Sequence, residues 1–298
     1  MVHKFTVEFP ETIWQAIQEK KGKSTIKDFL IRLIEKELEI SKIKVFILAG
    51  GEGARLKPLT ESIPKAMIPV SYKPLLEYNL ELLEKSGISE VFLLIGHLGS
   101  RIMKYFGQQW NNINLSYISE TTALDTAGAI DNVRNLISNT FIVMNSDILT
   151  NINILEIIKF HNKTKNVYPA TICGIEFNNY FESLNKSNEK SYYEDFGVFQ
   201  MESDDDGSMK ITKFEEKPSK LPKTSYINTG IYIFEPEILS YLKDSKGKSI
   251  SGDLLPKLIA DRKLNAYICD KNTFWLDVAH PARWSKAWDE LFSSAIEI

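Results

Sequence analysis

Residues 48–60 read LAGGEGARLKPLT, and residues 63–70 read IPKAMIPV. The loop follows a short apolar run, residues 45–48, which predicts a buried strand because it is bounded by glycines. Glycines let the backbone come close to a ligand, and their amide hydrogens can hold phosphate oxygens. Arg55 and Lys65 add the positive charge that a triphosphate requires. The stretch therefore predicts a strand followed by an anion-binding loop.

Two better-known glycine motifs do not fit this loop. The phosphate-binding loop of ATPases ends in Gly-Lys-Ser/Thr, which is missing here. The dinucleotide fingerprint needs a third glycine where Leu56 stands and a helix that Pro58 would break. A glycine loop alone fits a plain tight turn equally well, so the longer pattern decides the interpretation.

The whole run resembles the signature of the sugar-1-phosphate nucleotidyltransferases, also called nucleoside-diphosphate-sugar pyrophosphorylases. Their pattern is G-G-x-G-x-R-L-x-P-L-T followed by P-K-x-M/L-x-P, and every fixed position of it is present. The resemblance covers about residues 44–288. It implies an Mg²⁺-dependent enzyme that joins a nucleoside triphosphate (NTP) to a sugar 1-phosphate and releases pyrophosphate.

Length and composition set broad limits on the class of protein. The chain has 298 residues, enough for one large domain or two, and a net charge of −3, which does not favour nucleic acid or membrane partners. Apolar runs are too short to span a bilayer, and the N-terminus does not resemble a signal peptide. Cys173 and Cys269 lie far apart in sequence, which favours two buried thiols in the cytoplasm over a disulfide framework or a zinc site.

Residues 1–40 precede the nucleotidyltransferase pattern and have their own organisation. Residues 4–9 alternate polar and apolar and predict a strand, and residues 11–20 predict a helix with Ile13, Trp14 and Ile17 inward. Gly22 ends that helix, and Ser24 or Thr25 can cap a second one. The apolar stripe of the second helix consists of Ile26, Phe29, Leu30, Leu33, Ile34 and Leu38.

The order strand, helix, glycine turn, helix resembles a ribbon-helix-helix module, in which the strands of two chains pair. That resemblance implies a homo-oligomer joined through residues 1–40. Family members often bind DNA through outward strand residues, here Lys4, Thr6 and Glu8. The acidic Glu8, and seven basic residues balanced by seven acidic ones, favour a dimerisation module over a DNA reader. A helical arm that packs on its own enzyme domain remains an alternative.

Beyond residue 41 the chain alternates apolar strands with helical segments. Strands are expected at 45–48, 91–95, 115–118 and 141–144, with helices at 75–86, 101–106 and 126–136. This order predicts an α/β fold, a doubly wound, mainly parallel, Rossmann-like sheet, with a nucleotide-binding half at about 44–165. Short strands, a hairpin turn at Asp204-Asp205-Asp206-Gly207 and a packing helix with Trp284 and Trp288 mark the sugar-binding half, about 166–298.

The resemblance assigns the metal and the phosphates to four charged residues. Asp147 ends an apolar strand and resembles the metal aspartate of the family, and Asp277 in WLDV resembles the second. Carboxylates suit Mg²⁺, which would hold the phosphates of both substrates. Arg55 and Lys65 would bind the triphosphate and stabilise charge on the leaving pyrophosphate. Such transfer needs positioning and charge neutralisation rather than a protein nucleophile. The sequence agrees with this, because its four histidines are scattered and suggest no catalytic triad.

The same resemblance assigns the two binding pockets. Lys217 and Glu216 match the Glu-Lys-Pro motif that holds the sugar and its phosphate. Taken alone, Glu-Lys-Pro would fit a surface turn, an isolated aspartate would fit a helix cap or a turn, and Arg55 or Lys65 would fit a surface ion pair. Their occurrence together in one chain favours a functional site. The remaining sugar-phosphate residues are Gly197, Asn228 and Thr229, and the nucleotide-binding residues are Ala49, Gly50, Gly51, Gly53, Arg55, Lys65, Glu120, Asp125 and Gly128.

Two departures from the family pattern stand near these motifs. Asp125 replaces a glycine that is usual before Thr-Ala-Gly-Ala, where its side chain could clash or bond the ribose or base. Ala279-His280 replaces the usual Gly-Thr, and we expect His280 to be a structural replacement. Glu120 offers only acceptors when ionised, which suits the adjacent donors of guanine.

The loop resembles the mannose-1-phosphate guanylyltransferase branch, although glucose-1-phosphate uridylyl- and thymidylyltransferases remain alternatives. Because little sequence follows Trp288, we do not expect the long β-helix of bifunctional acetyltransferases. A second class of function is a DNA-binding regulator whose nucleotidyltransferase-like domain senses sugar or nucleotide. The matches at Arg55, Lys65, Asp147, Lys217 and Asp277 favour the enzyme.

Overall fold

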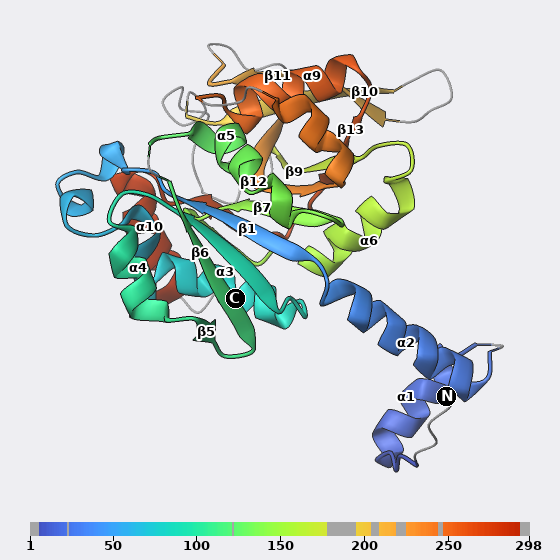
Figure 1. Cartoon of the computed structure of the whole chain (residues 1–298). Coiled ribbons are helices and arrows are strands. Elements are labelled where there is room, and N and C mark those ends of the chain that lie inside the picture. The colour runs from blue at the N-terminus through green and yellow to red at the C-terminus, as the bar shows by residue number, and fades with distance from the viewer. Residues whose placement is uncertain are drawn as a thin grey trace.

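The computed structural model describes residues 6–22, 24–120, 122–177, 195–203, 209–218, 225–243 and 247–292. Its centre is one mixed, ten-stranded sheet (Figure 1). The strands of this sheet are β1 (Lys44–Ala49), β4 (Glu90–Ile95), β5 (Gln109–Trp110), β6 (Ile113–Ser119), β7 (Phe141–Asn145), β9 (Ala170–Glu176), β10 (Gly197–Ser203), β11 (Met209–Glu216), β12 (Tyr226–Phe234) and β13 (Leu264–Ile268). Their order is β11-β10-β12-β7-β1-β4-β6-β5, with β9 paired to both β12 and β13.

The predicted parallel nucleus is confirmed in the first half of the chain. Strands β7, β1, β4 and β6 run parallel, in the register expected for strands linked by helices. Strand β1 is buried on both faces: Val45 and Ile47 belong to one core, and Phe46 belongs to the other. The second half joins this nucleus antiparallel, β12 against β7, and continues into the β10–β11 pair. The predicted turn at 204–207 lies outside the described residues.

Helices cover both faces of the sheet (Figure 1). On one face α3 (Leu75–Lys85), α4 (Gly99–Phe106) and α6 (Ile154–Thr164) pack on the core that contains Val45. On the other lie α5 (Asp125–Asn132) and α9 (Leu255–Ala260). The helix expected at 126–136 is shorter than predicted: α5 ends at Asn132, and a 3₁₀ turn, η4 (Arg134–Leu136), follows. No helix within the described ranges is long and apolar enough to cross a membrane.

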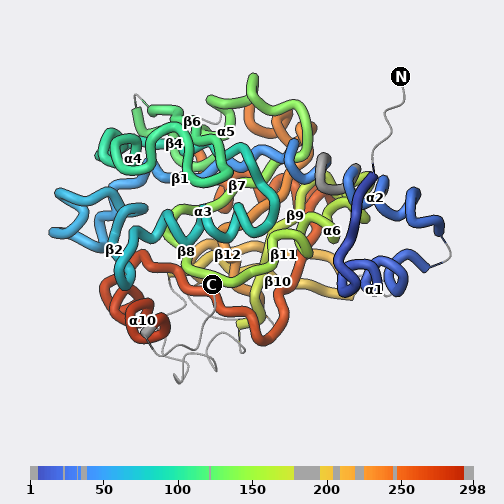
Figure 2. Tube along the Cα trace, turned by 90° about the horizontal axis from the view of Figure 1, so that it is seen from below, coloured from blue at the N-terminus to red at the C-terminus, as the bar shows by residue number. Residues whose placement is uncertain are grey.

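Short strands and a helix attach the C-terminal segment to the first half of the chain. The helix predicted around Trp284 and Trp288 is α10 (Pro281–Phe292), and both indole nitrogens donate to the carbonyl of Pro69, at 2.7 and 3.2 Å. This carbonyl belongs to β2, beside which α10 runs in Figure 2. The other small elements are η1 (Ala54–Leu56), η2 (Leu59–Glu61), η3 (Lys65–Met67), β2 (Pro69–Val70), β3 (Lys73–Pro74), β8 (Ile148–Thr150), β14 (Trp275–Asp277), η5 (Pro236–Leu242) and η6 (Ile250–Leu254).

Two helices, α1 (Glu11–Lys20) and α2 (Ile26–Ile40), project from the body as an arm (Figures 1 and 2). Both were expected at these positions, and Thr25 caps α2 by accepting the amide of Asp28 at 3.1 Å. The strand predicted at 4–9 is not formed in this single chain at residues 6–9; residues 1–5 lie outside the described part. A strand needs a neighbouring strand to bond its backbone, and the described chain places none beside residues 6–9.

The predicted orientation of the first arm helix is only partly correct. Ile17 is buried, whereas Ile13 and Trp14 are exposed, because the arm reaches away from the sheet. The second arm helix also exposes apolar side chains, including Leu33 and Ile34. The arm therefore carries an apolar face that the described part of the chain leaves largely uncovered.

The two cysteines meet although they are far apart in sequence. Strand β9 carries Cys173, and Cys269 directly follows β13, which pairs with β9. Both thiols are buried and free, as expected, and their Sγ atoms lie 3.3 Å apart.

Glu235, which directly follows β12, leads to a prediction about stability at acidic pH. Burial would raise the pKa of Glu235, but hydrogen bonds from His161 and Thr140 and the nearby charge of Lys165 lower it to about 2. A carboxyl with a depressed native pKa stabilises the fold above its unfolded pKa and loses that contribution as pH falls. We expect the stability difference between wild type and Glu235→Gln to shrink between about pH 4.5 and 2.

Urea unfolding across this pH range measures the difference. The control is Glu237→Gln, because Glu237 is largely exposed and, among the described residues, forms one ion pair, 3.8 Å from Lys263. A difference for Glu235→Gln that stays constant down to pH 2 would contradict the role of its ionised carboxylate.

Candidate active site

The glycine loop turns where the parallel strands β1 and β4 end. The amide of His97 donates to the carbonyl of Gly50 at 3.2 Å, and a Cβ on Gly96 would lie 2.7 Å from that carbonyl oxygen. Gly53 has φ +65°, a backbone conformation that favours glycine. The loops after β1 and β4 thus touch backbone to backbone, and a side chain at Gly96 would separate them.

A cavity of about 310 Å³, here called the first cavity, opens over these loops. It contains most of the predicted nucleotide-binding residues, and burial raises the pKa of the Glu120 carboxyl within it. Its lining includes Leu48, Gly50, Gly51, Lys65, Glu120, Asp125, Thr126, Ala129, Asn145, Ser146 and Asp147.

A second cavity of about 400 Å³ lies between the two halves of the sheet. It brings together all the predicted sugar-phosphate residues, namely Gly197, Glu216, Lys217, Asn228 and Thr229, with Asp277. A Cβ on Gly197 would lie 2.8 Å from Glu216 Oε2 and 2.6 Å from the Phe214 ring, so a larger residue here would displace these side chains. Both cavities are lined by Asp125, Thr126, Asn145 and Asp147, which makes them one continuous site.

The two predicted metal carboxylates lie where the cavities join. The antiparallel pair β8–β14 sets Asp277 opposite Ile148, next to Asp147, and the amide of Val278 donates to the Asp147 carbonyl at 2.7 Å. Burial and the charge of Asp147 raise the pKa of Asp277. Burial opposes ionisation of Asp147 too, but the ion pair with Lys65 holds its pKa below the ordinary value. Asp147 is therefore the better anion of the pair.

This carboxylate pair fits Mg²⁺. The described residues contain no cluster of three or more His, Cys, Asp or Glu side chains that could hold a metal by themselves. Mg²⁺ commonly uses one or two carboxylates together with substrate phosphates, and hard oxygen ligands are what Asp147 and Asp277 supply. Asp147 lines both cavities and Asp277 lines the second, which matches that requirement.

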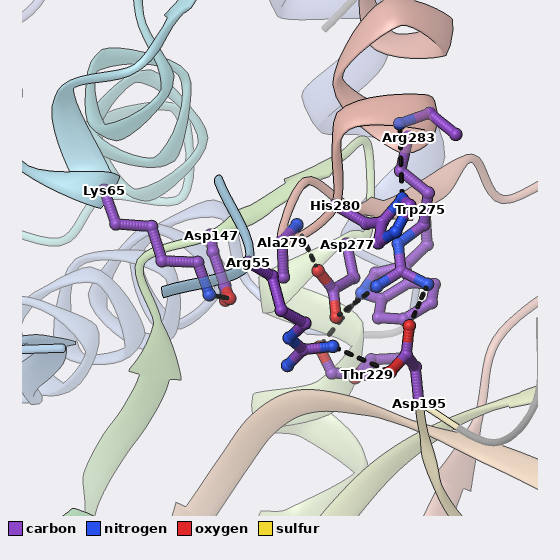
Figure 3. Close-up of polar contacts among 11 residues, drawn as sticks. Arg55, Lys65, Asp147, Asp195, Thr229, Trp275, Asp277, Ala279, His280 and Arg283 are labelled. Atoms are coloured by element: carbon purple, nitrogen blue, oxygen red, sulfur yellow. Dashed lines mark hydrogen bonds and ion pairs between the residues drawn. The ribbon is translucent and has the colours of Figure 1, made fainter. Parts of the chain in front are cut away.

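Three further charged residues surround the carboxylate pair (Figure 3). Arg55 points across the second cavity and donates to Asp195 Oδ1 at 2.9 Å. The other carboxylate oxygen of Asp195 accepts from Arg283 Nη1 of α10 at 3.3 Å. Sequence reasoning missed Asp195 and Arg283, because these contacts join positions 140 and 88 residues apart. The sequence did offer one hint of Arg283: it lies on the helix that follows the WLDV motif, which contains Asp277.

Two non-glycine residues of the site have left-handed backbones. Asp125 has φ +58° and Lys217 has φ +50°. The first value explains why glycine suits position 125 in the family pattern, and the Asp125 carboxylate accepts the Thr126 amide at 2.6 Å. Such strained residues cluster at functional sites, where the surrounding structure imposes them. The Asp125 side chain thus bonds the first turn of its own helix.

Some predicted residues line neither cavity. Ala49 is buried at the end of β1, and Gly128 lies inside α5. Gly53 acts through the shape of the loop, since a Cβ there would meet Thr60 at 2.8 Å. His280 Nδ1 accepts the amide of Ala282 at 3.3 Å near the start of α10, as expected for a structural replacement.

The chain is similar in sequence to known transferases. The nucleotidyl transferase family profile matches residues 44–291. A UTP–glucose-1-phosphate uridylyltransferase of Synechocystis sp. is 32% identical over 81% of this chain and 62% of its own length. The mannose-1-phosphate guanylyltransferase catalytic subunit beta of Xenopus tropicalis is 30% identical over 80% of this chain and 62% of its length. The chain thus spans about three fifths of these relatives.

A solved structure supports the fold. The UDP-glucose pyrophosphorylase complexed with UDP-glucose superimposes with a TM-score of 0.67 at 21% identity, over 85% of this chain and 99% of that one. At this identity the likeness concerns the fold alone.

Gly230, which follows Asn228 and Thr229, generates a prediction about the wall of the second cavity. It has φ +77°, and a Cβ would lie 2.5 Å from Asn145 Nδ2. Gly230→Ala should lower the free energy of unfolding by about 2–5 kcal/mol, the sum of left-handed strain and overpacking. Gly247→Ala is the matched control, because Gly247 has φ +72° with nothing within 4 Å of its Cβ.

The control should lose only the backbone cost, about 1–2 kcal/mol. Urea unfolding of both variants gives the comparison. Equal losses would show that contact with Asn145 does not constrain this wall.

Proposed function

Because this chain belongs to the nucleotidyl transferase family, we propose that it transfers a nucleotidyl group from an NTP to a sugar 1-phosphate and releases pyrophosphate. One observation carries the proposal: two cavities, each with the residues expected for one substrate, share Asp147 at their junction. A reaction that joins two phosphates needs such a shared point, with charge neutralisation close by.

The NTP occupies the first cavity and the sugar 1-phosphate the second. The amides of Gly50 and Gly51 face the phosphates of the NTP, and Glu120 faces its base. In the second cavity Lys217 holds the sugar phosphate, and Glu216 and Asn228 bond the sugar hydroxyls. Both phosphates then meet at Asp147 and Asp277.

The chemistry is a direct displacement. A phosphate oxygen of the sugar 1-phosphate attacks the α-phosphorus, and the bond from that phosphorus to the bridging oxygen of pyrophosphate breaks. Bound at Asp147 and Asp277, Mg²⁺ would supply charge neutralisation and orientation of the phosphate oxygens. Lys65 and Arg55 stabilise the negative charge that develops on the leaving pyrophosphate. No protein group needs to gain or lose a proton.

For the base we favour guanine, and for the sugar mannose. Glu120 lines the first cavity, and an ionised carboxylate accepts two adjacent donors, which guanine presents on one edge. Transfer of a uridylyl or thymidylyl group to glucose 1-phosphate is the competing specificity. The similarity to both a uridylyltransferase and a guanylyltransferase is compatible with either.

Residues 1–40 form a separate module that joins copies of this chain. Its helices expose Ile13, Trp14, Ile31, Leu33 and Ile34, too much apolar surface for two short helices to cover alone. A second arm, with its strand paired to the first in ribbon-helix-helix fashion, would cover this face. The balanced charge of the segment favours protein pairing over DNA.

Asp147→Asn tests the proposed reaction. We expect wild type to release pyrophosphate with Mg²⁺ for one pair within a matrix of GTP, UTP, dTTP, ATP and CTP against glucose, mannose and N-acetylglucosamine 1-phosphates. The variant should lose at least about a hundredfold in turnover, because it removes the negative charge shared by both cavities. Asp131→Asn is the control, since Asp131 pairs with Arg134 and lines neither cavity. Normal turnover in Asp147→Asn would refute the metal assignment.

The arm generates a separate prediction about assembly. Deleting residues 1–40 should lower the oligomer mass measured by light scattering and leave most of the pyrophosphate-releasing activity. In the full chain, Leu33→Lys with Ile34→Lys should have the same effect, because charges on the apolar face oppose pairing. Gln15→Lys adds a charge to an exposed polar position and should change nothing. An unchanged mass after the deletion would exclude pairing through the arm.

A further inference from the structure

Asp195 is shared by two arginines from distant parts of the chain. Arg55 of the glycine loop donates to Oδ1 at 2.9 Å, and Arg283 of α10 donates to Oδ2 at 3.3 Å (Figure 3). One carboxylate therefore joins the loop proposed to bind the triphosphate to the C-terminal helix.

The two arginine side chains differ in how freely they can move. The Arg283 side chain is only 4% exposed, its guanidinium lies 5.0 Å from the centre of the Phe196 ring, and its Nη2 lies 3.8 Å from Asp277. The side chain of Arg55 is 45% exposed, and among the described residues it forms one side-chain ion pair, with Asp195. Packing thus fixes Arg283, whereas the more exposed Arg55 can exchange one partner for another.

Arg55 is held on the sugar side of the site. It lines the second cavity with Asp195 and is absent from the lining of the first, where Gly50, Gly51 and Lys65 lie. To neutralise a pyrophosphate group beside the glycine loop, its guanidinium must give up Asp195. Each bond to the carboxylate then competes with a bond to the phosphate.

We propose that Asp195 is a positioning residue that holds Arg55 in reserve and competes with polyphosphate for it, while Arg283 weakens this hold by sharing the charge of Asp195. The inference rests on the proposed role of Arg55 in binding the triphosphate. It assigns a function to Asp195 and Arg283 without requiring either to touch a substrate.

Two substitutions should act in opposite directions. Asp195→Asn removes the charge that competes for Arg55, so polyphosphate should bind more tightly. Arg283→Met leaves Arg55 as the cation paired with Asp195 in the described structure, so polyphosphate should bind more weakly. Each change should be about two- to fivefold, the range of a half-exposed ion pair. The double variant should bind polyphosphate more tightly than Arg283→Met, because the carboxylate charge that competes for Arg55 is then gone.

Isothermal titration of the full chain with inorganic pyrophosphate in Mg²⁺ measures these affinities. Arg55→Ala provides the decisive background. If Asp195 acts through Arg55, Asp195→Asn loses its effect when Arg55 is alanine, a coupling that a double-mutant cycle isolates. A general effect of charge would persist in that background and would overturn the inference.

The outcomes separate this inference from the proposed function. If Arg55→Ala itself leaves pyrophosphate binding unchanged, the proposed role of Arg55 fails. If Arg55→Ala weakens binding but Asp195→Asn does not strengthen it, the competition fails and the role of Arg55 stands. If Arg283→Met does not fold, Arg283→Lys replaces it as a test of whether a positive charge at this buried position matters. This variant keeps the charge, so it should bind pyrophosphate with an affinity within twofold of wild type. Thermal unfolding of each variant confirms that the fold is intact.

Discussion

A short antiparallel ladder decides where the site can form. Strand β14, almost at the end of the chain, pairs with β8, and this pairing sets Asp277 beside Asp147. The cost of placing two buried carboxylates together is large, and burial with mutual repulsion raises the pKa of Asp277. The ladder and the packing of α10 against β2 provide the rigidity that keeps the two side chains together. Both cavities are built around this point.

Compensating cations surround the carboxylates in the described structure. Lys65 pairs with Asp147, and Arg283 lies near Asp277 and Asp195, so that each carboxylate has a positive neighbour. Part of this compensation comes from residues that our proposal assigns to the phosphates of a substrate. On binding, polyphosphate and a divalent cation would exchange partners with Lys65 and Arg55, replacing internal ion pairs by pairs to the ligand. This would let one set of charges stabilise both the free and the occupied site.

Much of this arrangement could be predicted from local patterns. The strand at 45–48, the glycine loop and the helices that cover the sheet have clear apolar periods and turn residues, and the structure confirms them. The convergence of Asp147, Lys217 and Asp277 followed from motif contexts that resemble one family, while their roles stay predictions.

What sequence reasoning missed depends on long-range packing. The bridge from Arg55 through Asp195 to Arg283 has no local signature, since each contact crosses 88 or more residues. The left-handed backbone at Asp125 was not expected either, although a usual glycine at that position hinted at it. The alternating pattern at residues 4–9 also predicted a strand, but residues 6–9 form none in the described chain, because no neighbouring strand is there to bond them.

The most direct test of this account is the position of the metal. Crystals of the full chain grown with Mn²⁺ and an NTP, measured at the manganese absorption edge, should show one anomalous peak within about 2.5 Å of carboxylate oxygens from both Asp147 and Asp277. That result would establish the carboxylate pair as the point where the two substrates are joined. A peak bound elsewhere, with Asp147 still paired to Lys65, would contradict it.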